Sequence, residues 1–300
     1  MGTDPVRPGV AVSVHPIVRR LLAPNPSMFT GPGTNTWLIG ASGPVTVVDP
    51  GPDLPEHLDA IQAEAPSIGH IVVTHTHSDH SPGAATLARR TGAPVLGFGP
   101  MLRPGVEHHD DTFEADTLLV DGDVVGGDDH RLVAVHTPGH ASNHLCFVLD
   151  VGRERLILTG DHVMQGSTVV IAPLDGDMAE YLYQLRRLQD LKPDRLLPGH
   201  GDPIDDPHTY VQSYLDHRAA REAQIVDALA HAGAGGATAE ALVAEVYTDV
   251  AEHLHPVAVY STWAILRKLG GEGAATCPAP EDREAVWISS QDGGRSERSP

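Results

Sequence analysis

The sequence predicts an α/β fold over roughly its first two thirds, with a smaller helical region after it. Short apolar and β-branched runs alternate with helical patterns between Val10 and Ile171, which is typical of layered α/β domains. Several of these runs end in Gly, Asp or His, residue types that begin loops. After Pro207 the pattern changes to consecutive helices. The 300 residues are enough for one large domain and a small second one.

The elements of the first region follow from local composition. Strands are predicted within residues 34–40, 44–51, 70–75, 93–99, 131–140, 144–150, 155–162 and 193–201. Helices are predicted at residues 55–65, 81–92 and 177–191, where apolar side chains recur at helical spacing or a glycine stops the pattern. We expect these elements to form one domain at residues 10–206.

The second region is predicted to be a small winged-helix-like domain at residues 207–290. Helical patterns cover residues 207–233, 238–250 and 256–271, and the run REAVWISS at 283–290 has the composition of a closing strand. The polar residues 291–300 are predicted to be a disordered tail.

Charge and cysteine content exclude several classes of protein. Lys and Arg number 20 against 40 Asp and Glu, so the net charge is 20 − 40 = −20. This charge repels anionic membranes and weighs against a broad phosphate-binding surface. Cys146 and Cys277 are not spaced like metal ligands or a redox pair. Without a signal-like stretch or a window of ~20 apolar residues, we expect a cytoplasmic protein that does not bind membranes.

The segment THTHSDH, which follows the apolar run HIVV, indicates a metal site. His75 and His77 are two residues apart at a strand end, so both point to the same side, and Asp79 and His80 follow in the turn. Imidazole and carboxylate together are ligands for zinc and its first-row neighbours.

Three further candidate ligands follow other predicted strands. His140 stands in HTPGH, Asp161 in LTGD and His200 in LPGHG, each beside a glycine. Loops at one edge of a sheet converge, and glycine lets the backbone approach a metal closely. We therefore expect these loops to complete the site that THTHSDH begins.

The ordered motifs VVDPG, THTHSDH, HTPGH, LTGD and LPGHG resemble those of the metallo-β-lactamase-fold hydrolases. The resemblance implies a four-layer αββα sandwich with two metal ions between the sheets. It also implies that Asp49 orients a ligand or a nearby loop. The ligands that it implies are His75, His77 and His140 for one ion, Asp79, His80 and His200 for the other, and Asp161 as a bridge.

The chain also resembles the subgroup called β-lactamase-like protein 2. The resemblance rests on NPSMFTGPGTNTWLIG near the start, YLDHRAAREAQI after the last metal motif and HPVAVYSTWAILRKLGGEG in the C-terminal region. It covers nearly all of residues 15–290.

The chemistry implied is hydrolysis. Two divalent ions, zinc by preference with manganese or iron as alternatives, lower the pKa of a bridging water and stabilise charge on the substrate. The candidate catalytic residues are Asp79 as a ligand, and His144 and His162 as groups that orient substrate or protonate a leaving group.

The substrate stays open between several classes. The subgroup includes enzymes that act on single-stranded RNA, which would need a local basic groove built from Arg19, Arg20, Arg89, Arg90 and Arg218. A small-molecule thioester or ester, as in glyoxalase II, is the alternative. A β-lactamase fits less well because those enzymes are exported. A protein that binds metal without catalysis is disfavoured as well, because loss of a ligand would indicate it and none of the seven ligands is missing.

The C-terminal region is predicted to have a structural role. Residues 207–300 hold 7 Lys and Arg against 13 Asp and Glu, a net charge of 7 − 13 = −6. A winged helix that binds duplex DNA needs a basic face. We expect this region to wall the active-site mouth or to form a homodimer, with Val259, Trp263, Leu266 and Leu269 as a packed helix face.

Overall fold

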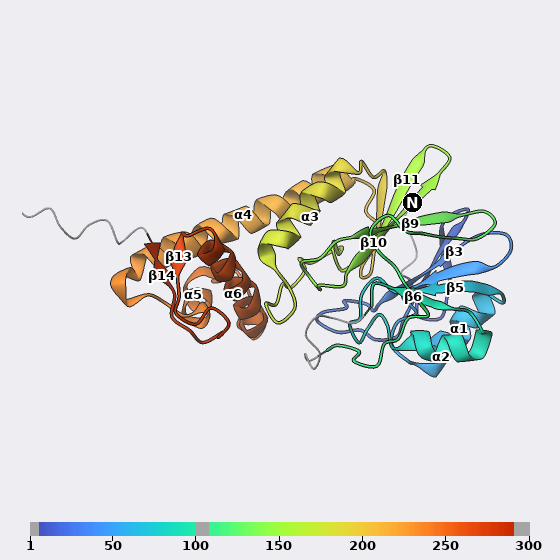
Figure 1. Cartoon of the computed structure of the whole chain (residues 1–300), viewed down its shortest axis with the longest axis horizontal. Coiled ribbons are helices and arrows are strands. Elements are labelled where there is room, and N and C mark those ends of the chain that lie inside the picture. The colour runs from blue at the N-terminus through green and yellow to red at the C-terminus, as the bar shows by residue number, and fades with distance from the viewer. Residues whose placement is uncertain (1–5, 100–107, 291–300) are drawn as a thin grey trace, which may run out of the picture.

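The computed structural model of the chain describes residues 6–99 and 108–290. The tail predicted at residues 291–300 therefore lies outside the described residues. Figure 1 shows a sandwich of sheets and helices, at the right of the view, joined to a helical part at the left by the long helix α4 (Pro207–His231).

The first sheet has seven strands, in the order β1-β2-β3-β4-β5-β6-β7. Its first four strands pair antiparallel, and β4 to β7 pair parallel. The strands are β1 (Val12–His15), β2 (Val18–Leu22), β3 (Asn35–Ile39), β4 (Val45–Val48), β5 (Ile68–Val72), β6 (Val95–Gly97) and β7 (Thr117–Leu118). Helices α1 (Pro55–Glu64) and α2 (Gly83–Thr91) cover its outer face, where Leu58, Ile61 and Leu87 are fully buried.

The second sheet has five strands, in the order β12-β11-β10-β9-β8. All its pairs are antiparallel except β11 with β12. The strands are β8 (Val124–Gly126), β9 (Arg131–His136), β10 (Leu145–Val151), β11 (Glu154–Gly160) and β12 (Arg195–Pro198). Helix α3 (Met178–Asp190) packs on its outer face through Tyr181 and Leu185.

The apolar core between the two sheets completes the four-layer αββα architecture predicted from the motifs. Trp37, Val48 and Val72 of the first sheet share one cluster with Phe147 and Leu158 of the second. Strands with both faces covered are buried along their whole length and mostly apolar, as the run VTVV of β4 illustrates.

The C-terminal part has the helices and the strand pair that define a winged-helix-like unit. After α4 follow η1 (Gly233–Gly235), α5 (Ala239–Val246), η2 (Glu252–Leu254), α6 (His255–Gly271), β13 (Ala275–Thr276) and β14 (Ile288–Ser289). The short strands pair antiparallel, so the closing strand predicted at 283–290 is present but shorter. No helix in the part of the chain that the structure describes is long and apolar enough to cross a membrane.

Helix α6 shares the hydrophobic core that lies over the second sheet. Trp263, Leu266 and Leu269 belong to the same cluster as Tyr181 and Leu185 of α3. The indole nitrogen of Trp263 donates to Pro280 O at 3.0 Å. The packed face predicted for this helix is confirmed for these three residues, whereas Val259 is only half-buried.

Replacing Trp263 should therefore destabilise the whole protein. We expect Trp263→Ala to lower the free energy of unfolding by about 3–5 kcal/mol, because it leaves a large cavity in a core shared by both parts. Urea denaturation measures the change. Tyr183→Ala on α3 is the control, since Tyr183 is 60% exposed and its loss should change stability by less than about 0.5 kcal/mol. Equal effects of the two substitutions would contradict the shared core.

A second prediction concerns His57 of α1, which is 1% exposed. Burial lowers the pKa of His57 from 6.5 to about 4. As the pH falls below 6.5, the unfolded chain binds a proton at His57 that the native protein binds only near pH 4. The stability present above pH 6.5 is thus lost as the pH falls to about 4, and this group accounts for about 3 kcal/mol of the loss.

Urea unfolding at pH 7 and pH 4, with a chelator at both, measures this loss. His57→Gln keeps an N–H donor without the titration. The variant should lose about 3 kcal/mol less stability between the two pH values than the parent protein. Parallel losses in the two proteins would show that His57 does not titrate as described.

Candidate metal centre

The seven predicted ligands converge at one edge of the two sheets. They come from the loops after β5, β9, β11 and β12. Their ligand atoms form two groups, each within 4.8 Å: His75, His77, His140 and Asp161 in one, and Asp79, His80 and His200 in the other. We call these the first and second clusters.

In the first cluster three imidazole nitrogens face one another. His77 Nδ1 lies 2.9 Å from His75 Nε2 and 3.0 Å from His140 Nε2. The far nitrogen of His140 is 2.9 Å from Val170 O, which only accepts hydrogen bonds. Nδ1 of His140 therefore carries the proton, and the lone pair of Nε2 points into the cluster.

In the second cluster two histidines and a carboxylate meet. His200 Nε2 lies 3.3 Å from His80 Nε2 and 3.1 Å from Asp79 Oδ2. The far nitrogens of both rings face acceptors, because His80 Nδ1 is 2.9 Å from Asp49 Oδ2 and His200 Nδ1 is 3.2 Å from Gly33 O. These outer contacts direct both Nε2 atoms toward the same point.

Asp161 lies between the clusters. Its Oδ1 is 3.3 Å from His80 Nε2 and 3.4 Å from His200 Nε2, and its Oδ2 is 3.8 Å from His140 Nε2. Oδ1 is buried without a hydrogen-bond partner among the described residues. One oxygen thus faces each cluster, which is the arrangement of a carboxylate that joins two cation sites.

Charge in the centre favours a bound cation. Burial and the rings of His80 and His77 hold the pKa of His75 well below its usual value, so the ring is neutral. Burial also favours the neutral form of His200, but Asp161 and Asp79 outweigh it and raise the pKa of His200 to about 9. The carboxylates of the second cluster therefore attract positive charge, a proton or a metal ion.

The donor set fits a divalent metal. Imidazole nitrogens with unprotonated lone pairs and carboxylate oxygens suit zinc and its neighbours. The backbone at Gly199 packs so closely against the second cluster that no side chain fits there. A methyl group on Gly199 would lie 2.7 Å from both Asp161 Oδ1 and His80 Cε1. The glycine of LPGHG is thus required by the approach of His80 and Asp161 to the backbone.

Two predicted catalytic residues lie behind the centre and do not face it. His144 is fully buried; its Nδ1 is 2.8 Å from Thr137 Oγ1, and its Nε2 accepts from the backbone N–H of Asp161 at 3.1 Å. His162 is fully buried against the ring of Tyr181. The substrate contacts that we predicted for them are therefore corrected: His144 positions the Asp161 backbone, and burial keeps His162 from a substrate.

A histidine outside the predicted motifs lies beside the first cluster instead. The ring of His109 is 4.5 Å from that of His77, and the residue is half-buried. Backbone hydrogen bonds hold this loop to the opening motif, from Ser78 N to His108 O and from Asp110 N to Thr76 O, each 2.8 Å. His109 is missing from the residues predicted from the sequence, because residues 108–110 follow no predicted strand. The only sign of a functional residue there is the pair of histidines in HHD.

Known proteins are similar to this chain in sequence and in fold. A family model described as "Metallo-beta-lactamase superfamily" matches residues 29–200, and one described as "Beta-lactamase associated winged helix domain" matches residues 238–276. The Drosophila melanogaster protein named "Beta-lactamase-like protein 2 homolog" is 31% identical over 276 residues, which are 89% of this chain and 92% of that protein.

Two further similarities extend over most of the chain. An "Atrochrysone carboxyl ACP thioesterase" of Aspergillus chevalieri is 33% identical over 271 residues, which are 86% of this chain and 82% of that protein. The crystal structure of a beta-lactamase domain protein from Burkholderia ambifaria has a TM-score of 0.79 at 20% identity, covering 95% of this chain and 96% of that one. The structural likeness concerns the fold.

The position of Asp161 predicts how its loss would act. Asp161→Asn keeps the volume but removes the negative charge that faces both clusters, so metal content after zinc-supplemented expression should fall to half of the parent protein's value or less. Elemental analysis measures this. Asp59→Asn is the control, because Asp59 is an exposed partner of Arg90. Full metal content in Asp161→Asn would refute the joining role.

Proposed function

The chain belongs to the metallo-beta-lactamase superfamily and is a metal-dependent hydrolase, and we propose that its substrate is a carboxylic thioester or ester. We further propose that it holds two zinc ions, one in each cluster, with Asp161 between them. The donor set and the two groups of converging atoms support this assignment.

The observation that carries the substrate proposal is the acidic charge of the protein and of the loop beside the centre. Asp110 and Asp111 directly follow His109, whose ring lies 4.5 Å from that of His77. A polyanion such as RNA would approach against this charge and against the net charge of −20. A substrate with an uncharged acyl group would not be repelled in this way.

The arginines named for a basic groove do not form one. Arg19 and Arg90 bind Glu64 and Asp59. Arg20 binds Asp202, and the guanidinium of Arg218 donates to Val169 O. Helix α2, which carries Arg89 and Arg90, lies far from α4, which carries Arg218 (Figure 1).

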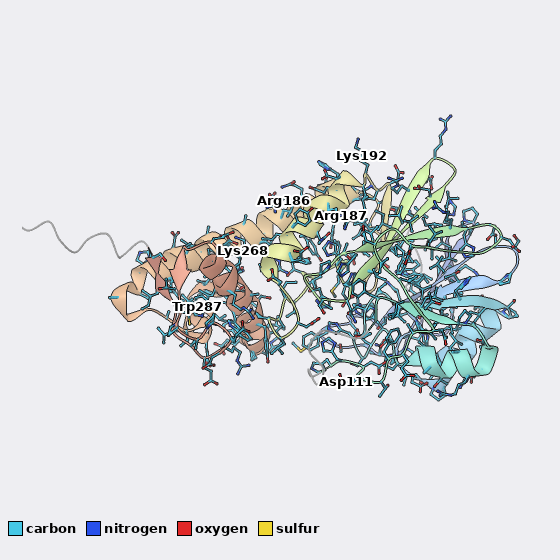
Figure 2. All side chains as sticks on the ribbon, viewed as in Figure 1. Asp111, Arg186, Arg187, Lys192, Lys268 and Trp287 are labelled. Carbon is cyan, nitrogen blue, oxygen red and sulfur yellow. The ribbon has the colours of Figure 1, made fainter. Side chains whose placement is uncertain are left out.

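Among the residues that the structure describes, three further cations lie away from the loop that carries Asp111. Figure 2 shows Arg186, Arg187 and Lys192 on and just beyond α3, well apart from Asp111, which lies at the lower side of the molecule in this view. Arg187 is also paired with Asp121, at 2.8 Å. The phosphodiester substrate, which was the first candidate from the sequence, would need such cations beside the clusters.

Apolar surface near the same loop also supports an acyl substrate. Met28 and Phe29 are 55% and 47% exposed, and the ring of Phe29 lies 6.3 Å from that of His108. Hydrogen bonds fix this turn, among them Thr30 Oγ1 to Asn25 O at 2.6 Å. A rigid apolar turn beside a hydrolytic centre suits the hydrocarbon part of an acyl group.

The residues of the centre have distinct roles in this proposal. Divalent ions bound there would activate water and stabilise the developing oxyanion. The outer contacts of His80, His140 and His200 keep their Nε2 lone pairs turned inward. We propose that the half-buried ring of His109 hydrogen-bonds the leaving group, because it combines contact with His77 and access to solvent.

The test is a hydrolysis screen of the zinc-loaded protein. Its substrates are S-acetyl-N-acetylcysteamine, p-nitrophenyl acetate, S-lactoylglutathione, bis-p-nitrophenyl phosphate and a single-stranded RNA oligonucleotide. We expect turnover of the uncharged thioester or ester, a loss of roughly 100-fold or more in Asp161→Asn, and no metal-dependent RNA cleavage. His109→Gln should lower the rate by roughly 100-fold, and His208→Gln, at an exposed position of α4, should leave it unchanged.

The screen also identifies failure of the proposal. RNA cleavage that depends on metal and is lost in Asp161→Asn, without turnover of any thioester or ester, would replace it with the phosphodiester function. Equal rates of His109→Gln and His208→Gln would show that His109 does not bind the leaving group, and the substrate class would still be decided by the substrates that are hydrolysed.

A further inference from the structure

One buried carboxylate, Asp49, orients a histidine in each cluster. Its Oδ2 accepts from His80 Nδ1 at 2.9 Å and from the hydroxyl of Thr74 at 2.8 Å, and its Oδ1 accepts from the Thr74 backbone at 2.7 Å. The Thr74 oxygen in turn lies 3.0 Å from His75 Nδ1. Because the Thr74 hydroxyl donates to Asp49, it accepts from His75. A shift of Asp49 would therefore turn one ligand of each cluster.

The backbone of Asp49 is held in an uncommon conformation. Its φ is 52°, in the left-handed region that a non-glycine residue seldom adopts, and Pro50 follows it. The backbone N–H donates to Val72 O at 2.9 Å, and the carbonyl accepts from Thr36 Oγ1 at 2.6 Å. A residue such as Asp49 does not favour this backbone conformation by itself, so the hydrogen bond from the Thr36 hydroxyl on β3 to its carbonyl helps to hold it there.

His57 completes this chain of hydrogen bonds from α1. Its Nε2 lies 2.8 Å from Thr36 Oγ1. The Asp49 carbonyl can only accept, so the Thr36 proton points to Asp49 and the Thr36 oxygen accepts from His57 Nε2–H. The direction of every hydrogen bond is therefore determined, and all of them run toward Asp49: from His57 through Thr36 to its carbonyl, and from His80, and from His75 through Thr74, to its carboxylate.

The chain is buried and contains an unsatisfied atom. Thr36 is fully buried, His57 and Asp49 are each 1% exposed, and His57 Nδ1 has no hydrogen-bond partner among the described residues. A buried polar atom without a partner is unfavourable. An apolar side chain at position 57 would avoid it, so stability alone does not explain a histidine there. Its contact with Thr36 does.

We propose that Thr36 and His57 are positioning residues of the metal centre, which fix Asp49 so that His75 and His80 present their Nε2 atoms inward. Neither side chain contacts a ligand directly; both act through Asp49. The proposal rests on the metal binding that we propose above, and it does not depend on which bond the protein hydrolyses.

The test is Thr36→Val, which keeps the shape and removes the hydroxyl. We expect its affinity for Co²⁺, measured by competition with a chromophoric chelator, to fall roughly 10- to 100-fold, as loss of an outer hydrogen bond to a metal ligand does. The visible spectrum of the Co²⁺ protein should change as well. Thr36→Ser, which restores the hydroxyl, should recover both, and His57→Leu should shift them in the direction of Thr36→Val.

Thr46→Val is the matched control on the neighbouring strand β4. Thr46 is also fully buried, and its hydroxyl lies 2.7 Å from a ring nitrogen of buried His130, a contact that does not involve Asp49. Both valine variants lose a threonine–histidine hydrogen bond, so both should lose thermal stability. Only Thr36→Val should lose Co²⁺ affinity. Similar affinities in the two valine variants, or no recovery in Thr36→Ser, would overturn the proposal.

A measurement on the metal-free protein separates this proposal from the proposed function. In ¹⁵N-edited spectra the Nδ1–H of His80, buried against Asp49, should be visible in the parent protein and in Thr46→Val, and weakened or shifted in Thr36→Val. If the parent protein binds no Co²⁺, the proposed function fails. The spectrum still shows whether the Thr36 hydroxyl fixes the contact between Asp49 and His80. An unchanged His80 signal in Thr36→Val would overturn it.

Discussion

The structure depends on one electrostatic constraint: imidazole lone pairs and buried carboxylates crowd together at one point and need a positive charge among them. Asp79 and Asp161 raise the pKa of His200 to about 9, against the effect of burial. In the first cluster burial keeps the rings neutral, with three nitrogens about 3 Å apart. A set of this kind is stable around cations, and the surrounding fold keeps it from relaxing.

Two packed sheets satisfy that constraint. The ligands follow strands of both sheets, so the apolar core between the sheets fixes the distance between loops that are far apart in sequence. Backbone carbonyls and Asp49 then fix the orientation of the rings from outside. The centre is thus built from a rigid scaffold, a layer of orienting hydrogen bonds and the ligand atoms themselves.

The helical part stabilises this scaffold as well as extending it. Helix α6 contributes Trp263 and Leu266 to the core over the second sheet, and Arg267 donates to Pro173 O in the loop that precedes α3. The same loop region includes Val170, whose carbonyl orients His140. Packing of the C-terminal helices is therefore connected to the first cluster through a few residues of one loop.

The sequence by itself determined the α/β class, the strands and helices that carry the motifs, and the seven side chains that the structure brings together; it did not predict strands β1, β2, β7 and β8. These features depend on local patterns, because ligand-type residues follow a strand end in each motif, and in HTPGH, LTGD and LPGHG a glycine stands beside the ligand. Only the tertiary structure decided which histidines face the centre. His144 and His162 adjoin the motifs but are buried behind them, whereas His109 comes from a loop without a motif. The dispersal of the arginines and the chain through Thr36 and His57 were equally beyond the sequence, because burial and hydrogen-bond partners are set by segments distant along the chain.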